Sequence, residues 1–359
     1  MSVPKLMAAV QLIGHGGYDK LVYTDSAPLP TLAPGEVLIK VLAAGINNTD
    51  INTRVGWYSS QATASTADTK ESGLEASKGG WTGTGLTFPR IQGADVCGEI
   101  VSVGAGVADS RIGQRVIVQS CLLSLQSGDF TPWLGSERDG GFAQFVSAPS
   151  ADSYNIQSNL THSELAAVPC AFATAENLIG RVGLSAGEKV LITGASGNVG
   201  IAAIQLAKRR GCHVTAIAAL NKFAALEAAG ANRCMDRSSA IALTMGNNSA
   251  DVVIDVVGGP QWPDLLDVLT PRGRYAVSGA IAGPIVEMDL RKLYLKDLTL
   301  FGCTSQDAHV FSNLVGYIER GEIKPIVAKQ YPLHDIGLAQ QEFQTKKHVG
   351  KILLIPPEV

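Results

Sequence analysis

Hydrophobic positions divide the 359-residue chain into a first part of short strand-like runs and a second part in which strands alternate with helices. In the first 150 residues the apolar runs are short, contain many β-branched residues and end at Gly, Pro or Asp, which is typical of strands. The predicted strands are 36–46, 95–104, 115–120 and 142–149. Because no helices separate them, the pattern predicts an antiparallel or barrel-like domain.

The pattern changes at Thr161, where a helix signal replaces the strand signal. The residues "THSE" (161–164) have the spacing of a capping box, in which Thr161 caps a helix and Glu164 reaches back. A helix is predicted from here to about Gly180. Beyond it, strand-like runs alternate with helical runs, which predicts a parallel sheet with helices on both faces. Strands are predicted at 189–194, 213–218, 251–258, 273–279 and 298–302, and helices at 198–211 and 221–230.

The last part of the chain mixes both patterns, with helices predicted at 307–321 and 334–347 and a strand at 350–355. This order indicates two domains, the second inserted into the first. We therefore predict an α/β protein in which 1–155 and 306–359 form a β-rich domain. A doubly wound parallel-sheet domain is predicted at 156–305.

Two polar segments interrupt the predicted strands of the first part. The segment "GINNTDINTRVGWY" (45–58) reads as a turn that follows the strand 36–46. The segment 58–87 consists mostly of Ser, Thr, Gly and Ala and shows no sustained period. It is predicted to be a surface loop, or alternatively a lid over the substrate pocket with Tyr58 and Trp81 near its ends.

Composition and charge exclude several classes of protein. Hydrophobic residues make up 46% and charged residues 17% of the chain, which suffices for two buried cores. The net charge of -3 and the lack of a basic block argue against nucleic acid and anionic membranes as partners. No apolar run reaches the roughly 18 residues of a membrane-spanning helix, and the first residues lack a signal-peptide pattern. The cysteines form no CxxC pair, which favours free thiols in a reducing cytoplasm.

Three glycines stand between a predicted strand and a predicted helix, in "GASGNVG" (194–200). Their G-x-x-G-x-x-G spacing is a variant of the dinucleotide fingerprint, in which glycines allow a sharp turn, close approach of a pyrophosphate and close packing of helix on strand. The first amides of the helix and its dipole then hold the phosphates. The candidate cofactor-binding residues of this turn are Gly194, Ala195, Ser196, Gly197, Asn198, Val199 and Gly200.

The end of the second strand of this domain bears on which nicotinamide cofactor is bound. NAD-binding domains usually carry an acid there that bonds the ribose 2′-OH, but no Asp or Glu stands between Ile217 and Lys222. Asn221 and Lys222, and Arg237 after the third strand, are candidates to bind a 2′-phosphate, although Lys222 also fits an ordinary solvated lysine at a helix start. We therefore expect NADPH rather than NADH.

These segments together are similar to those of the medium-chain dehydrogenase/reductase superfamily, in the zinc-independent branch that resembles quinone oxidoreductases and mitochondrial-type enoyl thioester reductases. The resemblance covers nearly the whole chain. It rests on the order and spacing of "GEVLIKVLAAGINNTD" (35–50), "IQGADVCGEIVSVGAGV" (91–107), "IGQRV" (112–116), "PCAFATA" (169–175), "GASGNVG" (194–200), "DVVGG" (255–259) and "HVGKILL" (348–354). The segment 58–87 departs from it, since it is longer than such enzymes usually need.

The resemblance implies a GroES-like β-rich domain, a Rossmann domain and an NADPH-dependent oxidoreductase. It also implies a homodimer or homotetramer joined through the cofactor domain, with "LTLFG" (298–302) as a candidate edge strand. Zinc-dependent members bind the metal through three side chains, and the matching positions here are Asn47, Ala94 and Cys170. One cysteine is too few for a tetrahedral zinc, so a metal-free enzyme is expected, with Cys170 as a small buried residue lining the site.

Without a Lewis acid the oxidation of an alcohol is difficult, whereas an activated C=C accepts a hydride when donors stabilise the enolate and a proton completes the reaction. The segment 47–58 is similar to one in enoyl thioester reductases whose last tyrosine is the proposed proton donor. By this resemblance Tyr58 donates the proton, Asn47 orients the nicotinamide or substrate, and Asp50 holds the segment or reaches the cofactor through water. Alternatively, Tyr58 lines the pocket or packs the loop, Asn47 is a turn residue and Asp50 is structural.

The resemblance also implies cofactor contacts outside the glycine turn. They are Thr174 at the nicotinamide, Val257 and Gly258 at the adenosine or diphosphate, backbone groups of Ser278, Gly279, Phe301 and Cys303 at the carboxyl edge of the sheet, and Lys351 late in the chain. The substrate is expected to be a small molecule: an enone, an enoyl thioester or a quinone. The alternatives are a zinc-type alcohol dehydrogenase and a nucleotide-binding protein without turnover.

Overall fold

A computed structural model describes residues 4–59, 62–66, 68 and 85–358 of the chain, which divides into two compact units. Unit 1 consists of Met1–Ala62, Thr69–Cys170 and Phe311–Val359, and unit 2 of Thr63–Asp68 and Ala171–Val310. Most of the segment 58–87, with Trp81, lies outside the described residues, so the lid stays a prediction.

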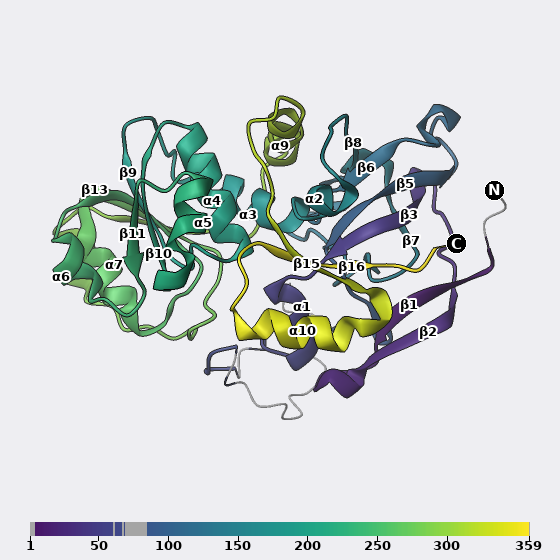
Figure 1. Ribbon diagram of the computed structural model, residues 1–359, viewed down its shortest axis with the longest axis horizontal. Coiled ribbons are helices and arrows are strands. Elements are labelled where there is room, and N and C mark those ends of the chain that lie inside the picture. The colour runs from purple at the N-terminus through teal and green to yellow at the C-terminus, as the bar shows by residue number, and fades with distance from the viewer. Residues whose placement is uncertain (1–3, 60–61, 67, 69–84, 359) are drawn as a thin grey trace. The chain divides into compact units, whose positions relative to one another are not determined.

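Unit 1 is built around a sheet with the strand order β15 (Val327–Pro332), β16 (Lys351–Ile355), β3 (Glu36–Gly45), β5 (Asp95–Val103), β6 (Arg115–Val118) and β8 (Ser153–Asn155), with β7 (Phe145–Pro149) also paired to β3 (Figure 1). A smaller sheet has the order β2 (Leu21–Pro28), β1 (Leu6–Leu12) and β4 (Arg90–Ile91). All pairs are antiparallel except β15 with β16. Paired apolar residues such as Ile39 and Ile100 are fully buried in one core. The antiparallel β-rich fold predicted here is confirmed.

The helices of unit 1 are short and lie around this sheet. They are α1 (Asn48–Val55), α2 (His162–Ala166), α9 (His309–Glu319), which starts at the end of unit 2, and α10 (Ile336–Thr345). Short 3-10 helices are η1 (Tyr18–Lys20), η3 (Asp109–Arg111), η4 (Leu123–Leu125), η5 (Ser150–Asp152) and η8 (Leu333–Asp335).

Two predictions about local structure are wrong. The segment 45–58 is not a turn, because Asn47 caps the helix α1, which ends at Gly56 in the left-handed conformation with φ 72. The helix predicted from Thr161 to about Gly180 is split into α2 and α3 (Pro169–Arg181), because proline lacks the backbone N–H and disfavours helical backbone just before it. The capping box itself is confirmed, since Glu164 N–H donates to Thr161 Oγ1 at 3.2 Å and Thr161 N–H donates to Glu164 Oε2 at 2.9 Å.

Unit 2 contains a parallel sheet with the order β11 (Arg233–Asp236), β10 (His213–Ala218), β9 (Lys189–Ile192), β12 (Ala250–Asp255), β13 (Leu269–Val277) and β14 (Thr299–Gly302). The further helices are α4 (Asn198–Arg209), α5 (Phe223–Ala229), α6 (Ile241–Met245), α7 (Trp262–Val268), α8 (Leu290–Tyr294), η6 (Leu220–Lys222) and η7 (Gly259–Gln261). Figure 1 shows α4 and α5 on one face of the sheet and α6 and α7 on the other. Counted along the chain, the strand order is 3-2-1-4-5-6, the order of dinucleotide-binding sheets, so the doubly wound fold is confirmed.

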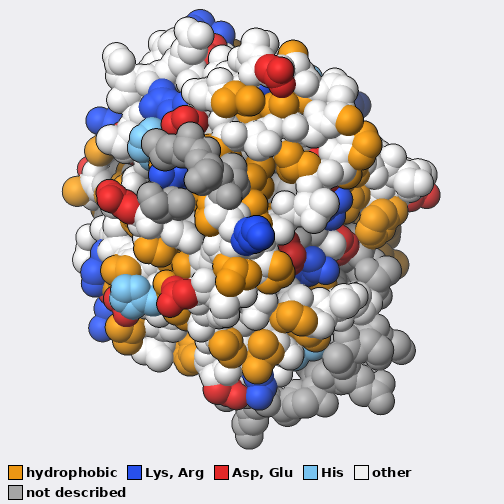
Figure 2. Space-filling model, turned by 90° about the vertical axis from the view of Figure 1, so that its right-hand side faces the viewer, with side chains coloured by type: hydrophobic (Ala, Val, Ile, Leu, Met, Phe, Trp, Pro, Cys, Tyr) orange, Lys and Arg blue, Asp and Glu red, His pale blue; other side chains and the backbone are white. Residues whose placement is uncertain are grey.

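The compact units divide at Cys170 and Val310, whereas the sequence placed the domain limits at 155 and 305. The helix α2 packs against β3 and β5, and this contact keeps the residues after 155 with unit 1. No helix among the described residues is long and apolar enough to cross a membrane. On the face drawn in Figure 2, positive and negative side chains are interspersed rather than gathered by sign.

Candidate functional site

Five buried residues of unit 1 meet at the N-terminus of α1. The carboxylate of Asp50 accepts the backbone N–H of Asn47 at 2.7 Å. The side chain of Asn47 donates from Nδ2 to Asp95 Oδ2 at 2.7 Å and accepts at Oδ1 from Lys351 Nζ at 2.6 Å. Lys351 and Asp95 form an ion pair, and Asp95 Oδ1 accepts the backbone N–H of Cys170 at 2.6 Å. We call Asn47, Asp50, Asp95, Lys351 and Cys170 the α1 cluster.

Three strands bring the α1 cluster together. Gly45 ends β3, pairs with Asp95 at the start of β5, and pairs on its other side with Leu353 of β16. A Cβ at Gly45 would lie 2.6 Å from Asp95 Oδ2 and would collide with Lys351 Cε, so only glycine leaves room for the ion pair. The side chain of Lys351 is 1% exposed and that of Asp95 0%, which makes this a fully desolvated pair.

Asp50 is held in a setting that favours its protonated form. Burial raises the pKa of Asp50 to about 7, and the negative charge of nearby Asp95 acts in the same direction. The hydrogen bond from Asn47 N–H and the positive charge of Lys351 act to lower the pKa. The carboxyl of Asp50 therefore changes its charge near neutral pH, which is unusual for an aspartate.

Tyr58 follows α1 in the chain, and its phenol lies against side chains of this helix. The phenol oxygen is bonded by the Thr49 side chain and lies 3.4 Å from Asn52 Nδ2. Burial raises the pKa of Tyr58 to about 12, while the bonds from Thr49 and Asn52 act in the opposite direction. Tyr58 thus stays protonated over the whole neutral range and can donate a proton.

In unit 2 the glycine turn lies between β9 and α4. Gly194 has φ 55, Gly197 caps α4, and a Cβ at Gly200 would lie 2.5 Å from both Ala195 Cα and Gly194 O. These positions need glycine for the turn and for the close packing of helix on strand. The residues present therefore fit a dinucleotide, with Ser196, Asn198 and Val199 in the turn and the first turn of α4.

A lysine reaches this turn from the end of the neighbouring strand. Lys222 is 8% exposed, and its Nζ donates to Ser196 Oγ at 3.2 Å. Burial lowers the pKa of Lys222, and the nearby cation Arg237 lowers it further. Asn221 is exposed. One acid that the sequence analysis did not single out lies close by: Asp236 accepts the backbone N–H of Leu220 at 3.1 Å.

The turn after β12 is fixed by Asp255. The sequence analysis included this residue in a motif but gave it no role. Its buried carboxylate accepts the Thr193 hydroxyl at 2.5 Å and the Tyr275 hydroxyl at 2.6 Å. It also accepts the backbone N–H groups of Val257 at 2.9 Å and Gly258 at 3.2 Å. An aspartate at the end of an otherwise apolar strand is the signal that would have found it, because a buried carboxylate needs hydrogen-bond donors.

The remaining predicted residues divide between the units. Ser278 and Gly279 follow β13, Phe301 is in β14, Cys303 follows it, and Thr174 is half-buried on α3, all in unit 2. Tyr58, Asn47, Asp50 and Lys351 lie in unit 1, where the ammonium of Lys351 bonds Asp95 and Asn47. The roles assigned to these residues stay predictions.

The three positions that match zinc ligands do not provide a zinc site. The side chain of Asn47 is bonded to Asp95 and Lys351, Ala94 has no ligand atom, and Cys170 supplies a single thiol. In the part of the chain that the structure describes, no three His, Cys, Asp or Glu side chains are grouped as a metal site. The donor set therefore does not fit a catalytic zinc.

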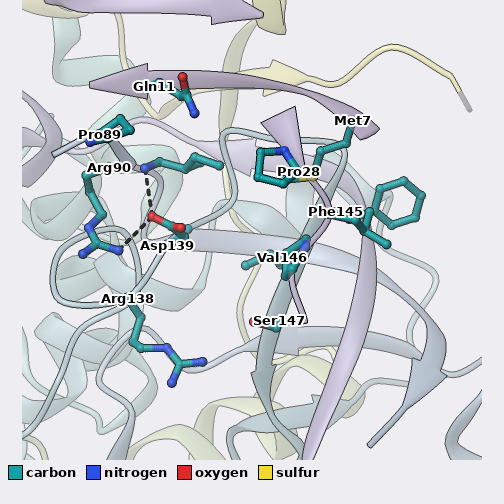
Figure 3. A pocket seen from close by; sticks show the side chains of 14 residues that line it. Met7, Gln11, Pro28, Pro89, Arg90, Arg138, Asp139, Phe145, Val146 and Ser147 are labelled. Carbon is teal, nitrogen blue, oxygen red and sulfur yellow. Dashed lines mark hydrogen bonds and ion pairs between the residues drawn. The ribbon is translucent and has the colours of Figure 1, made fainter. Parts of the chain in front are cut away.

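One hollow in unit 1 shares no lining residue with the α1 cluster. It has a volume of about 340 Å³ and is lined by Gln11, Phe145 and the pair Arg90–Asp139, whose Nη1 and Oδ1 are 2.8 Å apart (Figure 3). None of the site residues predicted from the sequence lines it.

Comparisons with known proteins agree with this fold. The alcohol dehydrogenase GroES-like domain family matches residues 33–158, and the zinc-binding dehydrogenase family matches 198–320. The chain is 27% identical to the rat (Rattus norvegicus) quinone oxidoreductase, over 98% of each chain. It is 28% identical to the acryloyl-coenzyme A reductase of Metallosphaera sedula, over 97% of this chain and 99% of that one.

A solved structure from Sinorhizobium meliloti 1021, described as an alcohol dehydrogenase, is 43% identical and has a TM-score of 0.89, with 99% of this chain and 98% of that chain covered. These matches extend over both units. The chain belongs to the medium-chain dehydrogenase/reductase superfamily, in its quinone oxidoreductase-like branch, and is an NAD(P)H-dependent oxidoreductase.

Proposed function

We propose that this protein is a zinc-independent reductase that transfers a hydride from NADPH to an activated C=C bond, in an enone or enoyl thioester, or to a quinone. The observation that carries the proposal is the α1 cluster. At Asn47, one of the positions that match zinc ligands, an amide is hydrogen-bonded to a carboxylate and an ammonium group. The protonated phenol of Tyr58 follows the same helix and lies 3.4 Å from its Asn52 Nδ2.

The chemistry then divides between cofactor and protein. NADPH, when bound, supplies the hydride. Tyr58 donates the proton from its hydroxyl, and its high pKa keeps that proton in place until negative charge develops on the substrate. Asn47, tied to Asp95 and Lys351, fixes the start of α1 and with it the position of Tyr58. The names of the rat and Metallosphaera relatives support a quinone and an enoyl thioester as acceptors.

The choice of NADPH over NADH is supported by the charges beside the glycine turn. Lys222 and Arg237 bring two cations near Ser196, where a 2′-phosphate would gain charge-assisted hydrogen bonds. Asp236 acts against this, but its carboxylate is already engaged by the backbone of Leu220 and by Ser238. The cysteines are all free thiols, which supports the proposed cytoplasmic location.

The test is oxidation of NADPH by chelator-treated enzyme with three acceptors: a simple enone, an enoyl thioester and a quinone. Tyr58→Phe is compared with Tyr331→Phe, which removes the same atom from a tyrosine in β15 that bonds Glu342. We expect turnover of the alkenes to fall about 10²-fold or more in Tyr58→Phe only.

Quinone turnover unchanged by Tyr58→Phe would show that this tyrosine only lines the pocket and that the protein is a quinone reductase. Turnover of an alcohol with NADP⁺ that disappears on chelation and returns with zinc would replace the proposal by an alcohol dehydrogenase. Tight NADPH binding without turnover of any acceptor would favour a nucleotide-binding role.

A further inference from the structure

A small cavity lies beside α1. Its volume is about 10 Å³, and it is lined by Thr49, Asp50, Thr53, Ala94 and the segment 133–136. A volume of about 10–15 Å³ is what a single water molecule needs, provided that two to four polar groups are there to bond it.

Polar groups for such a water are present. The cavity is lined by Asp50, Thr49 and Ser136, whose side chains end in a carboxyl group and two hydroxyl groups, and Ser136 is 4% exposed. Within the described part of the chain, the Ser136 hydroxyl has no hydrogen-bond partner. Buried hydroxyls are almost always bonded to protein or to ordered water, so the cavity has the features of a site for one water.

The cavity also connects two residues that the proposed function uses separately. Thr49 lines it together with Asp50, and the Thr49 side chain is hydrogen-bonded to the phenol of Tyr58. Asp50 and Thr49 therefore border the same cavity, and Thr49 is the link from this cavity to Tyr58. Paths of hydroxyl groups and water move protons because each oxygen can both accept and donate.

We propose that Asp50 is the internal proton source for Tyr58, and that the proton passes through one water in this cavity and the hydroxyl of Thr49. The inference rests on the proposed function. When the O–H bond of Tyr58 breaks and a C–H bond forms on the substrate, the phenolate takes the Thr49 proton. Thr49 takes a proton from the water, and the water takes one from Asp50, which becomes a carboxylate. Asp50 regains its proton from solvent before the next turnover, so one proton is consumed for each NADPH oxidised.

The charged groups around Asp50 suit this role. Burial raises the pKa of Asp50 to about 7, Asp95 acts in the same direction, and Lys351 acts against it. The ionisable group at the other end of the path is Tyr58. Asp50 therefore carries its proton below about pH 7 and lacks it above, and the rate of proton delivery falls as the pH rises through this value.

The test compares Asp50→Asn, which keeps an acceptor for Asn47 N–H, with Ser136→Ala, which removes only the hydroxyl that faces no partner. Ser120→Ala is the matched control, because Ser120 is equally buried but bonds Ala94 O at 2.7 Å and does not line the cavity. Two quantities are measured on the full chain: the pH profile of kcat, and the infrared C=O band of protonated Asp50, isolated by subtracting the Asp50→Asn spectrum.

We expect the kcat of the wild type to fall above about pH 7, and Asp50→Asn to lower kcat about 10²-fold and to flatten the profile, with KM for NADPH unchanged. The Asp50 band should disappear as the pH rises through about 7, and Ser136→Ala should shift it while Ser120→Ala leaves it in place.

Loss of activity in Tyr58→Phe together with a normal kcat profile in Asp50→Asn would overturn the relay and leave the proposed function intact. If no acceptor is turned over, the proposed function fails. The infrared band then shows independently whether Asp50 holds a proton beside the cavity. A wild-type protein without that band at pH 6, or a band unmoved by Ser136→Ala, would overturn the inference.

Discussion

At the scale of single residues, Lys351 supplies the positive charge that compensates the buried carboxylate of Asp95 in the α1 cluster. It is the cation against Asp95, and its Nζ also donates to Asn47 Oδ1 at 2.6 Å. Removing one partner of a desolvated ion pair leaves the other charge buried and uncompensated, which is much more costly than removing an exposed pair.

Lys351→Met should therefore lower the free energy of unfolding by about 3–5 kcal/mol, measured by urea unfolding followed through the β-rich unit. The matched control is Lys329→Met, on the neighbouring strand β15, whose pair with Glu342 is 2.7 Å long but about half exposed. This control should change stability by less than about 1 kcal/mol. Equal effects of the two substitutions would show that burial of the Lys351 pair contributes nothing.

Sequence reasoning named four of the five residues of this cluster and missed Asp95, but it did not foresee the contacts that join them. Asn47 and Asp50 stand in one helix cap, and a resemblance within a continuous segment was enough to single them out. Their partners Asp95 and Lys351 are 48 and 304 residues away from Asn47, and they meet it only because β3, β5 and β16 pair. Hydrogen bonds between distant strands depend on register, which the alternation of apolar residues does not specify to the level of one contact.

At the scale of elements, the carboxyl ends of parallel strands determine the cofactor site of unit 2. The turn after β9 carries Ser196, and η6, which follows β10, carries Lys222, so two neighbouring strand ends bring these side chains within 3.2 Å. This part of the site was predictable because alternating strands and helices imply parallel neighbours whose ends share one edge.

Lys222→Ala should weaken NADPH binding about tenfold or more and leave NADH binding nearly unchanged, because a charge-assisted hydrogen bond of about 1.5–3 kcal/mol is lost with the 2′-phosphate only. Fluorescence titration with each cofactor measures this. Lys208→Ala, an exposed lysine of α4, is the control and should affect neither cofactor. An equal loss of affinity for NADH and NADPH would show that Lys222 does not bind the 2′-phosphate.

The helix α1 illustrates what the pattern could not show. Its buried face contains Asp50, Asn52 and Arg54 as well as Ile51, so polar side chains occupy positions that normally mark a core. The guanidinium of Arg54, 1% exposed, donates to Gln340 Oε1 at 3.0 Å and lies over the ring of Tyr18. Because a distant residue bonds the buried guanidinium of Arg54, the local sequence reads as a polar turn while the fold makes it a helix.

At the scale of the whole molecule, the end strand β14 bears on assembly. It has a partner on one side only, and exposed apolar side chains lie on it and just before it: Leu290, Tyr294, Leu295 and Leu300. A strand edge with an apolar surface favours pairing with the same edge of a second copy around a two-fold axis.

We therefore predict a dimer that Leu295→Lys with Leu300→Lys shifts towards monomer, measured by light scattering over a range of concentrations. Leu338→Lys is the control, since Leu338 is 57% exposed on α10 of unit 1 and should leave the mass unchanged. A wild-type mass of one chain at all concentrations, or a dimer indifferent to both lysines, would contradict this assignment.

The position of Lys351 in the chain has a consequence for how the protein folds during its synthesis. Residues 171–310 leave the ribosome as one continuous stretch that can complete its parallel sheet during synthesis. Asn47 and Asp95 emerge before that stretch, whereas their ammonium partner Lys351 emerges after it. A nascent chain can therefore complete its parallel sheet while the carboxylate of Asp95 still waits for the cation that compensates it.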